Sequence, residues 1–368
     1  MLPVGRRLAL ALVTVILVFG AAETALRIAG FTYQPYPDRI WLGRYAGGIP
    51  TADVVFDRVV PGLFTRDARL FWRPVAGKAP FNAAGLRDPD ELPAARLPGE
   101  VRILALGDSC TFLGEPDPWT EVLARRLAGR GRRIRVLNAG VPAWSSLQGR
   151  RYLEDPGLTF QPDIVLVYFG WNDHWRATVK PDAAFPVPRE TVVSLQRFLG
   201  HLRLYQALNR LLAGRAAAGG QRPPGPETDL ARTAASRPFR VPVADFEQNL
   251  EDIARLVAAH GGKTVFITAP SFLFSTAVPR YLFVHGFVAS GGEPIESIHA
   301  RYAAVVRRVA EKTGAVLVDA AQAFAAAPDA GRALLREDGI HLTHAGIERL
   351  AALLDRQLTA AGLLPAGR

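Results

Sequence analysis

The feature that most constrains the fold is an alternation of strand-length apolar runs with longer helical stretches from Val101 onward. The apolar runs have the length of buried strands, and they cover residues 101–106, 134–137, 164–169, 264–268 and 315–318. Helical patterns cover residues 119–129, 246–260, 298–313 and 345–361. This alternation predicts a parallel sheet with helices on both faces. We therefore expect an α/β fold, a three-layer, doubly wound, flavodoxin-like domain of about five strands.

The interval between the third and fourth predicted strands is too long for one crossover. Its first part, residues 189–212, has the pattern of an amphipathic helix. Residues 213–238 are dominated by Gly, Ala, Pro and Arg, and this composition buries too little apolar surface to offset the entropy of ordering. We predict a mobile insertion there.

The first hundred residues differ from the rest. Residues 32–100 are rich in proline, glycine and aromatic residues, with short candidate strands at 54–60 and 70–72. We interpret them as a stalk and an edge structure packed on the main domain. The predicted domains are therefore residues 1–31, 32–100 and 101–368.

The N-terminus predicts a membrane segment. Arg6 and Arg7 precede an uncharged run from Leu8 to Ala22, about 22 Å long as a helix and shorter than the ~30 Å hydrocarbon core. A helix over residues 8–31 would span the core, provided that Glu23 and Arg27 pair with each other or reach the far headgroups.

A cleaved signal peptide is the alternative, since a basic start, an apolar run and the small residues Gly20 and Ala22 fit that pattern too. In both cases the arginines stay inside and the rest of the chain is exported. We therefore expect the rest of the chain to be periplasmic or extracellular and tethered to the cell membrane, or secreted if the N-terminus is cleaved.

Charge and cysteine content exclude some partners. The formal charge is +10, but only four of the 44 basic residues are lysines, and the arginines are spread along the chain. Because no basic run interleaves with aromatic residues, we do not expect nucleic acid binding. The single cysteine, Cys110, cannot form an intrachain disulfide.

Polar residues follow the predicted strands. In an open parallel sheet, ligands bind beyond the carboxyl ends of the strands. Each polar set alone could be a turn or a helix cap. The four sets are Gly107-Asp108-Ser109, Asn138-Ala139-Gly140, Gly170-Trp171-Asn172-Asp173 and Asp338-Gly339-Ile340-His341.

In this order the four sets resemble the blocks of the SGNH (GDSL-like) hydrolase superfamily, over about Phe81 to Leu364. Segments 81–88 and 138–148 are similar to those of its membrane-anchored bacterial branch. By this resemblance, the donors to a developing oxyanion are the backbone N–H groups of Ser109 and Gly140 and the side-chain amide of Asn172.

The chemistry of the residues supports a nucleophilic mechanism. Ser109 needs a base to remove its proton, and His341 is the candidate because Asp338 can fix its tautomer. His344 is the rival base, interpreted as a supporting or capping residue. Asp108 and Asp173 are supporting residues, Asp108 as a turn or cap. His174, beside Asn172, is a candidate to touch substrate.

We therefore predict a serine esterase that hydrolyses an acyl ester through an acyl-serine intermediate, without a metal or a cofactor. The substrate would be a small acyl group on an envelope glycan or lipid. An O-acyltransferase would need the same residues. A non-catalytic glycan-binding scaffold is a third alternative, against which the intact Ser109, Asp338, His341 and Asn172 argue.

Overall fold

The computed structural model describes residues 3–33, 63–93, 95–128, 133–177, 180–218, 235–272, 282, 288–289 and 292–364. It contains two compact units. One comprises Met1–Trp72 and Val187–Gly225, and the other comprises Arg73–Pro186 and Pro226–Arg368. The domain boundaries expected after residues 31 and 100 stay predictions, and these units divide the chain at other positions.

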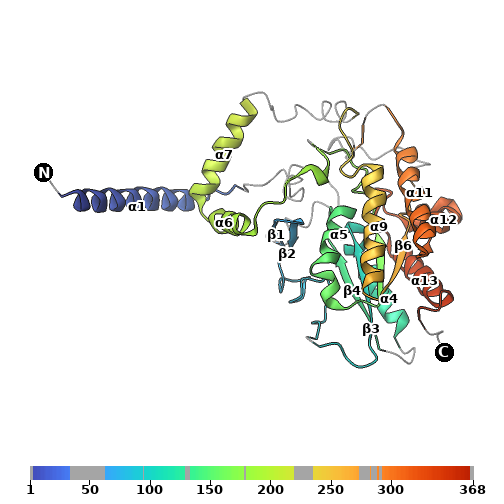
Figure 1. Cartoon of the computed structure of the whole chain (residues 1–368). Coiled ribbons are helices and arrows are strands. Elements are labelled where there is room, and N and C mark those ends of the chain that lie inside the picture. Colours follow the sequence, from blue (N-terminus) through green and yellow to red (C-terminus); the bar gives the residue numbers. More distant parts are fainter. Residues whose placement is uncertain are drawn as a thin grey trace. The chain divides into compact units, whose positions relative to one another are not determined.

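The second unit is built on one parallel sheet (Figure 1). Its strands lie in the order β4-β3-β5-β6-β7, and every neighbouring pair is parallel. This confirms the predicted doubly wound α/β fold. The strands are β3 (Val101–Gly107), β4 (Ile134–Gly140), β5 (Ile164–Tyr168), β6 (Lys263–Ile267) and β7 (Val316–Val318).

The strand order determines where polar residues meet. The chain runs from β3 out to β4 at the edge and returns to β5 on the other side of β3. Such a reversal leaves a crevice at the carboxyl ends of the strands. Gly107 is in register with both Gly140 and Tyr168, so β3, β4 and β5 end at the same level.

Helices cover the sheet. α4 packs against α13, while α9 packs against both α5 and α11. The core on one side joins Ile103 and Leu166 of the sheet to Leu123 of α4 and Leu354 of α13. Fully burying each such side chain stabilises the fold by about 1.5–3 kcal/mol. These helices are α4 (Trp119–Leu127), α5 (Ser146–Glu154), α9 (Val243–Ala259), α11 (Ile295–Thr313) and α13 (His344–Ala360).

Shorter elements complete this unit. In the described part of the unit, the helices α3 and α12 and three 3-10 turns connect the strands and the larger helices. Their bounds are α3 (Ser109–Phe112), α12 (Ala320–Ala325), η3 (Gly157–Phe160), η4 (Asp182–Ala184) and η5 (Pro328–Leu334).

The insertion after β5 differs from the prediction. Residues 189–212 form two helices rather than one, α6 (Glu190–Gly200) and α7 (Arg203–Ala218), and α6 ends at Gly200, a residue unfavourable inside a helix. α7 extends into the segment predicted to be mobile, so residues 213–218 are helical. Residues 219–234 lie outside the described part of the chain. At the end of the segment, the Pro238 carbonyl accepts the Ala177 N–H.

The first unit contains the predicted N-terminal helix, α1 (Val4–Ile28), with α6, α7, β1 (Phe64–Asp67) and the first two residues of β2 (Phe71–Pro74), which pairs with β1 in a two-stranded sheet. α1 has no buried residue and contains an 18-residue window with a mean hydropathy of 2.2, so its length and composition suffice to cross a membrane. A signal sequence has the same properties. β2 overlaps the strand expected at 70–72, whereas the strand expected at 54–60 lies outside the described residues.

Candidate active site

Ser109 lies at a tight turn between β3 and α3. Asp108 caps α3, because its Oδ1 accepts the Cys110 N–H at 2.8 Å. A Cβ atom on Gly107 would lie 2.1 Å from Thr111 Oγ1 and 3.0 Å from the Tyr168 carbonyl oxygen. Only glycine therefore allows the chain to turn here without displacing its neighbours. The turn leaves Ser109 partly exposed at the carboxyl end of the sheet.

The loop before α13 brings a histidine and a carboxylate to this serine. His341 Nε2 is 2.8 Å from Ser109 Oγ, and His341 Nδ1 is 2.6 Å from Asp338 Oδ2. The other carboxylate oxygen, Oδ1, accepts the backbone N–H groups of Ile340 at 2.8 Å and His341 at 2.9 Å. Both oxygens of Asp338 are therefore hydrogen-bonded, which fixes the carboxylate.

This arrangement determines the tautomer of His341. Burial by itself raises the pKa of Asp338, but the His341 ring and the backbone N–H groups of His341 and Ile340 together hold that pKa below its ordinary value. An ionised Asp338 only accepts, so His341 Nδ1 carries a proton, and in the neutral ring Nε2 presents a lone pair to Ser109. A neutral His341 could therefore accept the Ser109 proton.

The rival base lies elsewhere. His344 is the first residue of α13 and is exposed. The hydrogen bonds to Ser109 Oγ and to Asp338 Oδ2 both come from His341. The structure thus brings His341, and not His344, into the chain of hydrogen bonds.

Two of the three expected oxyanion donors are already engaged. Asn172 Nδ2 donates to Asp108 Oδ2 at 3.0 Å and to the Trp144 carbonyl at 3.1 Å, which uses both of its hydrogens. The Gly140 N–H donates to Asn138 Oδ1 at 2.9 Å. An oxyanion role for Asn172 or Gly140 therefore requires these hydrogen bonds to be broken or shared, and it stays a prediction.

The structure gives a different reason for glycine at position 140. A Cβ atom there would lie 2.7 Å from the Phe112 N and 2.9 Å from the Thr111 carbonyl carbon. These are backbone atoms of α3, the helix that begins with Ser109. The space that Gly140 leaves free is filled by this helix.

The loop between β4 and α5 contains a residue that sequence reasoning missed. Ala143 has a φ of +63°, in the left-handed region that non-glycine residues rarely adopt. Its carbonyl accepts Arg240 Nη1 at 2.9 Å, and the next carbonyl, of Trp144, accepts the Asn172 amide. No sequence signal marks this conformation at an alanine. The hydrogen bond from Arg240 holds the Ala143 conformation, and the bond from Asn172 to the next carbonyl places Ala143 near the Asn172 amide.

Asp108 and Asp173 tie the loop after β5 to its neighbours, Asp108 to the turn after β3 and Asp173 to α5. Besides capping α3, Asp108 accepts from Asn172, and burial raises its pKa to about 6. Asp173 accepts from the Ser146 N–H at 2.8 Å and the Gly170 N–H at 3.1 Å, and burial raises its pKa to about 7. Asp173 thus ties the loop after β5 to the first turn of α5.

His174 does not face a substrate, contrary to the sequence-based expectation. It is buried, and its Nε2 is 3.0 Å from Nδ1 of His299, whose own Nε2 is 2.9 Å from the Ala269 carbonyl oxygen. The Trp171 ring stacks on His299 with centroids 4.1 Å apart. Burial lowers the pKa of both histidines, that of His299 to about 4. Both imidazole rings are therefore neutral, and they pack in the interior of the protein.

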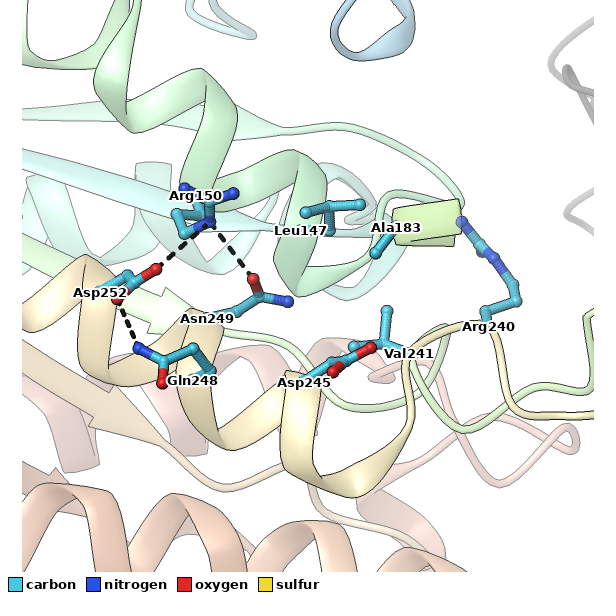
Figure 2. A pocket seen from close by; sticks show the side chains of 9 residues that line it. All are labelled: Leu147, Arg150, Ala183, Arg240, Val241, Asp245, Gln248, Asn249 and Asp252. Carbon is cyan, nitrogen blue, oxygen red and sulfur yellow. Dashed lines mark hydrogen bonds and ion pairs between the residues drawn. The ribbon is translucent and has the colours of Figure 1, made fainter. Parts of the chain in front are cut away.

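A cavity of about 180 Å³ lies between α5 and α9 (Figure 2). Arg150 donates to Asn249 and forms an ion pair with Asp252, which also accepts from Gln248. Because these polar groups satisfy one another and no triad residue lines the cavity, we place no chemistry there.

Within the described ranges, no group of three or more His, Cys, Asp or Glu residues could hold a metal ion.

A hydroxyl, an imidazole and a carboxylate joined by hydrogen bonds at the carboxyl end of a doubly wound sheet are the arrangement of serine hydrolases. The family model for the GDSL-like lipase/acylhydrolase family matches residues 105–349. The chain belongs to this family. No curated protein matches it.

Similar folds occur among solved structures. The lipase/acylhydrolase from Enterococcus faecalis is 19% identical, with a TM-score of 0.45, and the match covers 73% of this chain and 100% of that one. A putative GDSL-like lipase from Parabacteroides merdae is 16% identical, with a TM-score of 0.46 and coverage of 74% and 100%. A mutant of Axe2, an acetyl-xylooligosaccharide esterase from Geobacillus, is 16% identical, with a TM-score of 0.42 and coverage of 70% and 94%.

Proposed function

We propose that this protein is a serine esterase that hydrolyses an acyl ester through an acyl-serine intermediate. The observation that carries the proposal is the chain of hydrogen bonds from Ser109 Oγ through His341 to Asp338. Its distances are those of a working nucleophile, base and orienting group. Family membership supports the same reaction class.

The proposed reaction has two steps. As Ser109 Oγ attacks the ester carbonyl, His341 Nε2 takes the hydroxyl proton and Asp338 stabilises the imidazolium. The imidazolium then gives the proton to the leaving alkoxide, which leaves the acyl group on Ser109. A water molecule activated by the same nitrogen attacks the acyl-serine, releases the carboxylic acid and restores the hydroxyl.

The negative charge on the carbonyl oxygen needs hydrogen-bond donors. We propose the Ser109 N–H, the Asn172 amide and, in place of the engaged Gly140, the Ala143 N–H. In the described part of the chain, the Ser109 and Ala143 N–H groups donate to no other group of the protein, whereas Asn172 would exchange one of its two acceptors for the oxyanion. The left-handed backbone at Ala143, adjoining the residue that binds Asn172, supports this choice.

We further propose that α1 anchors the enzyme in a membrane with the catalytic unit outside the cytoplasm. Arg6 and Arg7 at the start of a long apolar helix support this orientation. An exported enzyme would meet small acyl groups on envelope glycans or lipids, which we propose as its substrate class.

The test uses purified full-length protein in detergent and nitrophenyl esters of graded chain length, with and without sugar acceptors. Ser109→Ala and His341→Ala should each remove nearly all turnover, and the double variant should lose little more, because the two residues act as one unit. His344→Ala is the matched control and should retain activity. Additive losses, or inactivation by His344→Ala with an active His341→Ala, would contradict the assignment. An acylated sugar product would identify the enzyme as a transferase.

A further inference from the structure

The helices α6 and α7 are attached to the C-terminal end of α1 (Figure 1). The Glu23 carboxylate accepts the backbone N–H groups of Arg203 at 3.0 Å and Leu204 at 2.8 Å, the first residues of α7. Arg27 pairs with Glu23 and also donates to the His201 carbonyl at 3.0 Å. The two charged residues of α1 that follow the apolar run are thus used to hold the turn between α6 and α7.

Both helices expose an apolar stripe. On α6 and the turn, the stripe comprises Val192, Leu195, Phe198 and Leu202, spaced for one helix face. Phe198 is 67% exposed, while Val193 on the other side of α6 is fully buried. α6 thus has two apolar faces, of which only one is covered in this unit.

The stripe on α7 comprises Leu208, Leu211 and Leu212, again spaced for one face, and Leu211 is 66% exposed. Large apolar side chains that gather in this way mark an interaction surface. We call these two stripes together the hairpin stripe. Residues 189–212 carry four arginines and one glutamate, a net charge of 4 − 1 = +3, which suits a surface of anionic lipid.

The attachment of the turn between α6 and α7 to Glu23 and Arg27 determines its depth along the anchor α1. From Leu8, just after the two arginines, to Ile28 the helix rises about 30 Å, which matches the ~30 Å hydrocarbon core. Glu23 then lies about 8 Å before the far edge of that core. The turn that Glu23 and Arg27 hold must lie at the same depth, within the leaflet that the C-terminal end of α1 reaches.

We propose that the hairpin stripe is inserted into that leaflet, so that α6 and α7 lie in the membrane interface beside the anchor. The inference rests on α1 being an uncleaved membrane anchor, as proposed above. It adds a second, non-spanning contact with lipid. α1 exposes its own apolar side chains and packs against α7, so lipid around the anchor would also reach the stripe, which favours lipid over a protein partner. Glu23 and Arg27 are tolerated at that depth because their polar groups are satisfied by each other and by α7.

The test places a fluorophore at single cysteines in the full chain, reconstituted in phosphatidylcholine–phosphatidylglycerol vesicles. Phe198→Cys and Leu211→Cys report on the hairpin stripe, and Val15→Cys reports on the anchor. Arg210→Cys is the matched control on the other side of α7, exposed and next to Leu211 in sequence. The native Cys110 is buried, so a maleimide added to the folded protein should spare it, and the unsubstituted chain gives the background.

We expect nitroxide-labelled lipid to quench positions 198, 211 and 15 strongly and aqueous iodide to quench them weakly. The ratio of lipid quenching to iodide quenching should be several-fold higher at these positions than at position 210. Each variant must keep the melting temperature of the parent chain.

Other outcomes separate the two proposals. Lipid quenching at position 15 with iodide quenching at 198 and 211 would overturn the insertion of the hairpin and leave the anchor intact. Protection of 198 and 211 from both quenchers would mean that protein covers the stripe, which also overturns the proposal. Iodide quenching at position 15 would instead show that the anchor itself is wrong.

Discussion

Asp338→Asn should inactivate the enzyme without unfolding it, for a reason that the hydrogen bonds of this loop make specific. In the native protein, Asp338 Oδ1 accepts two backbone N–H groups, and Oδ2 accepts from His341 Nδ1. Asparagine has one oxygen, and the two backbone donors require that oxygen at the Oδ1 position. The amide NH₂ must then face His341 Nδ1.

An NH₂ group facing Nδ1 reverses the tautomer of His341. Nδ1 becomes the acceptor and Nε2 carries the proton, so Nε2 has no lone pair for the Ser109 proton 2.8 Å away. In serine proteases, the same tautomer error lowers turnover by about 10⁴-fold, or about 5.5 kcal/mol of transition-state stabilisation. Because the backbone contacts of Oδ1 are kept, the melting temperature should fall by only a few degrees.

The assay is kcat/KM with a nitrophenyl ester, measured beside thermal unfolding of the same preparation. His344→Ala, in the adjacent first turn of α13, is the control for nonspecific effects of substitution near the loop. A folded Asp338→Asn variant that kept more than about a tenth of the parent kcat/KM would refute the tautomer argument.

Three further results are expected. Asn172→Ala should lower turnover by ~10²–10³-fold while a phosphonate inhibitor still labels Ser109; unchanged turnover would exclude Asn172 as an oxyanion donor. Gly140→Ala should lower both activity and the free energy of unfolding, the latter by about 1–3 kcal/mol, because its Cβ would lie 2.7 Å from the Phe112 N; a denaturation midpoint equal to that of the parent would show that α3 yields easily. Burial raises the pKa of Asp173 to about 7, so the folded state retains a proton that the unfolded state releases from about pH 4 upward. The free energy of unfolding of the parent relative to Asp173→Asn should therefore fall as the pH rises from about 4 to about 7, and a difference that stays flat or increases in denaturant titrations at several pH values would contradict this sign.

The sheet could be predicted because its signals are local. Apolar runs of strand length and the helices between them mark β3 to β7, and three of the four polar sets lie at the ends of β3, β4 and β5. α5 was not predicted, since Gly149 is unfavourable within a helix. The structure explains this glycine: a Cβ atom there would lie 2.3 Å from the Phe169 ring. Tertiary packing, which no local pattern reveals, outweighs helix propensity at this position.

The residue types in the site could be predicted from the sequence, but the acceptors to which their N–H groups donate could not. Whether the Asn172 amide is free depends on the distance of Asp108 and Trp144 from one nitrogen atom. The buried ion pair of Arg240 and Asp182 joins residues 58 positions apart. Neither fact leaves a periodicity or a motif in the sequence.

The nucleophile and its base stand 232 positions apart in the chain, which has a consequence for the order in which the enzyme matures. Contacts between residues so distant in sequence form late, since a long loop must close first. A polypeptide that emerges amino end first presents Ser109 while the segment carrying His341 is still to come. Synthesis or export that stops before residue 341 would therefore leave the proposed nucleophile without its proposed base, so esterase activity would report that the chain extends past His341.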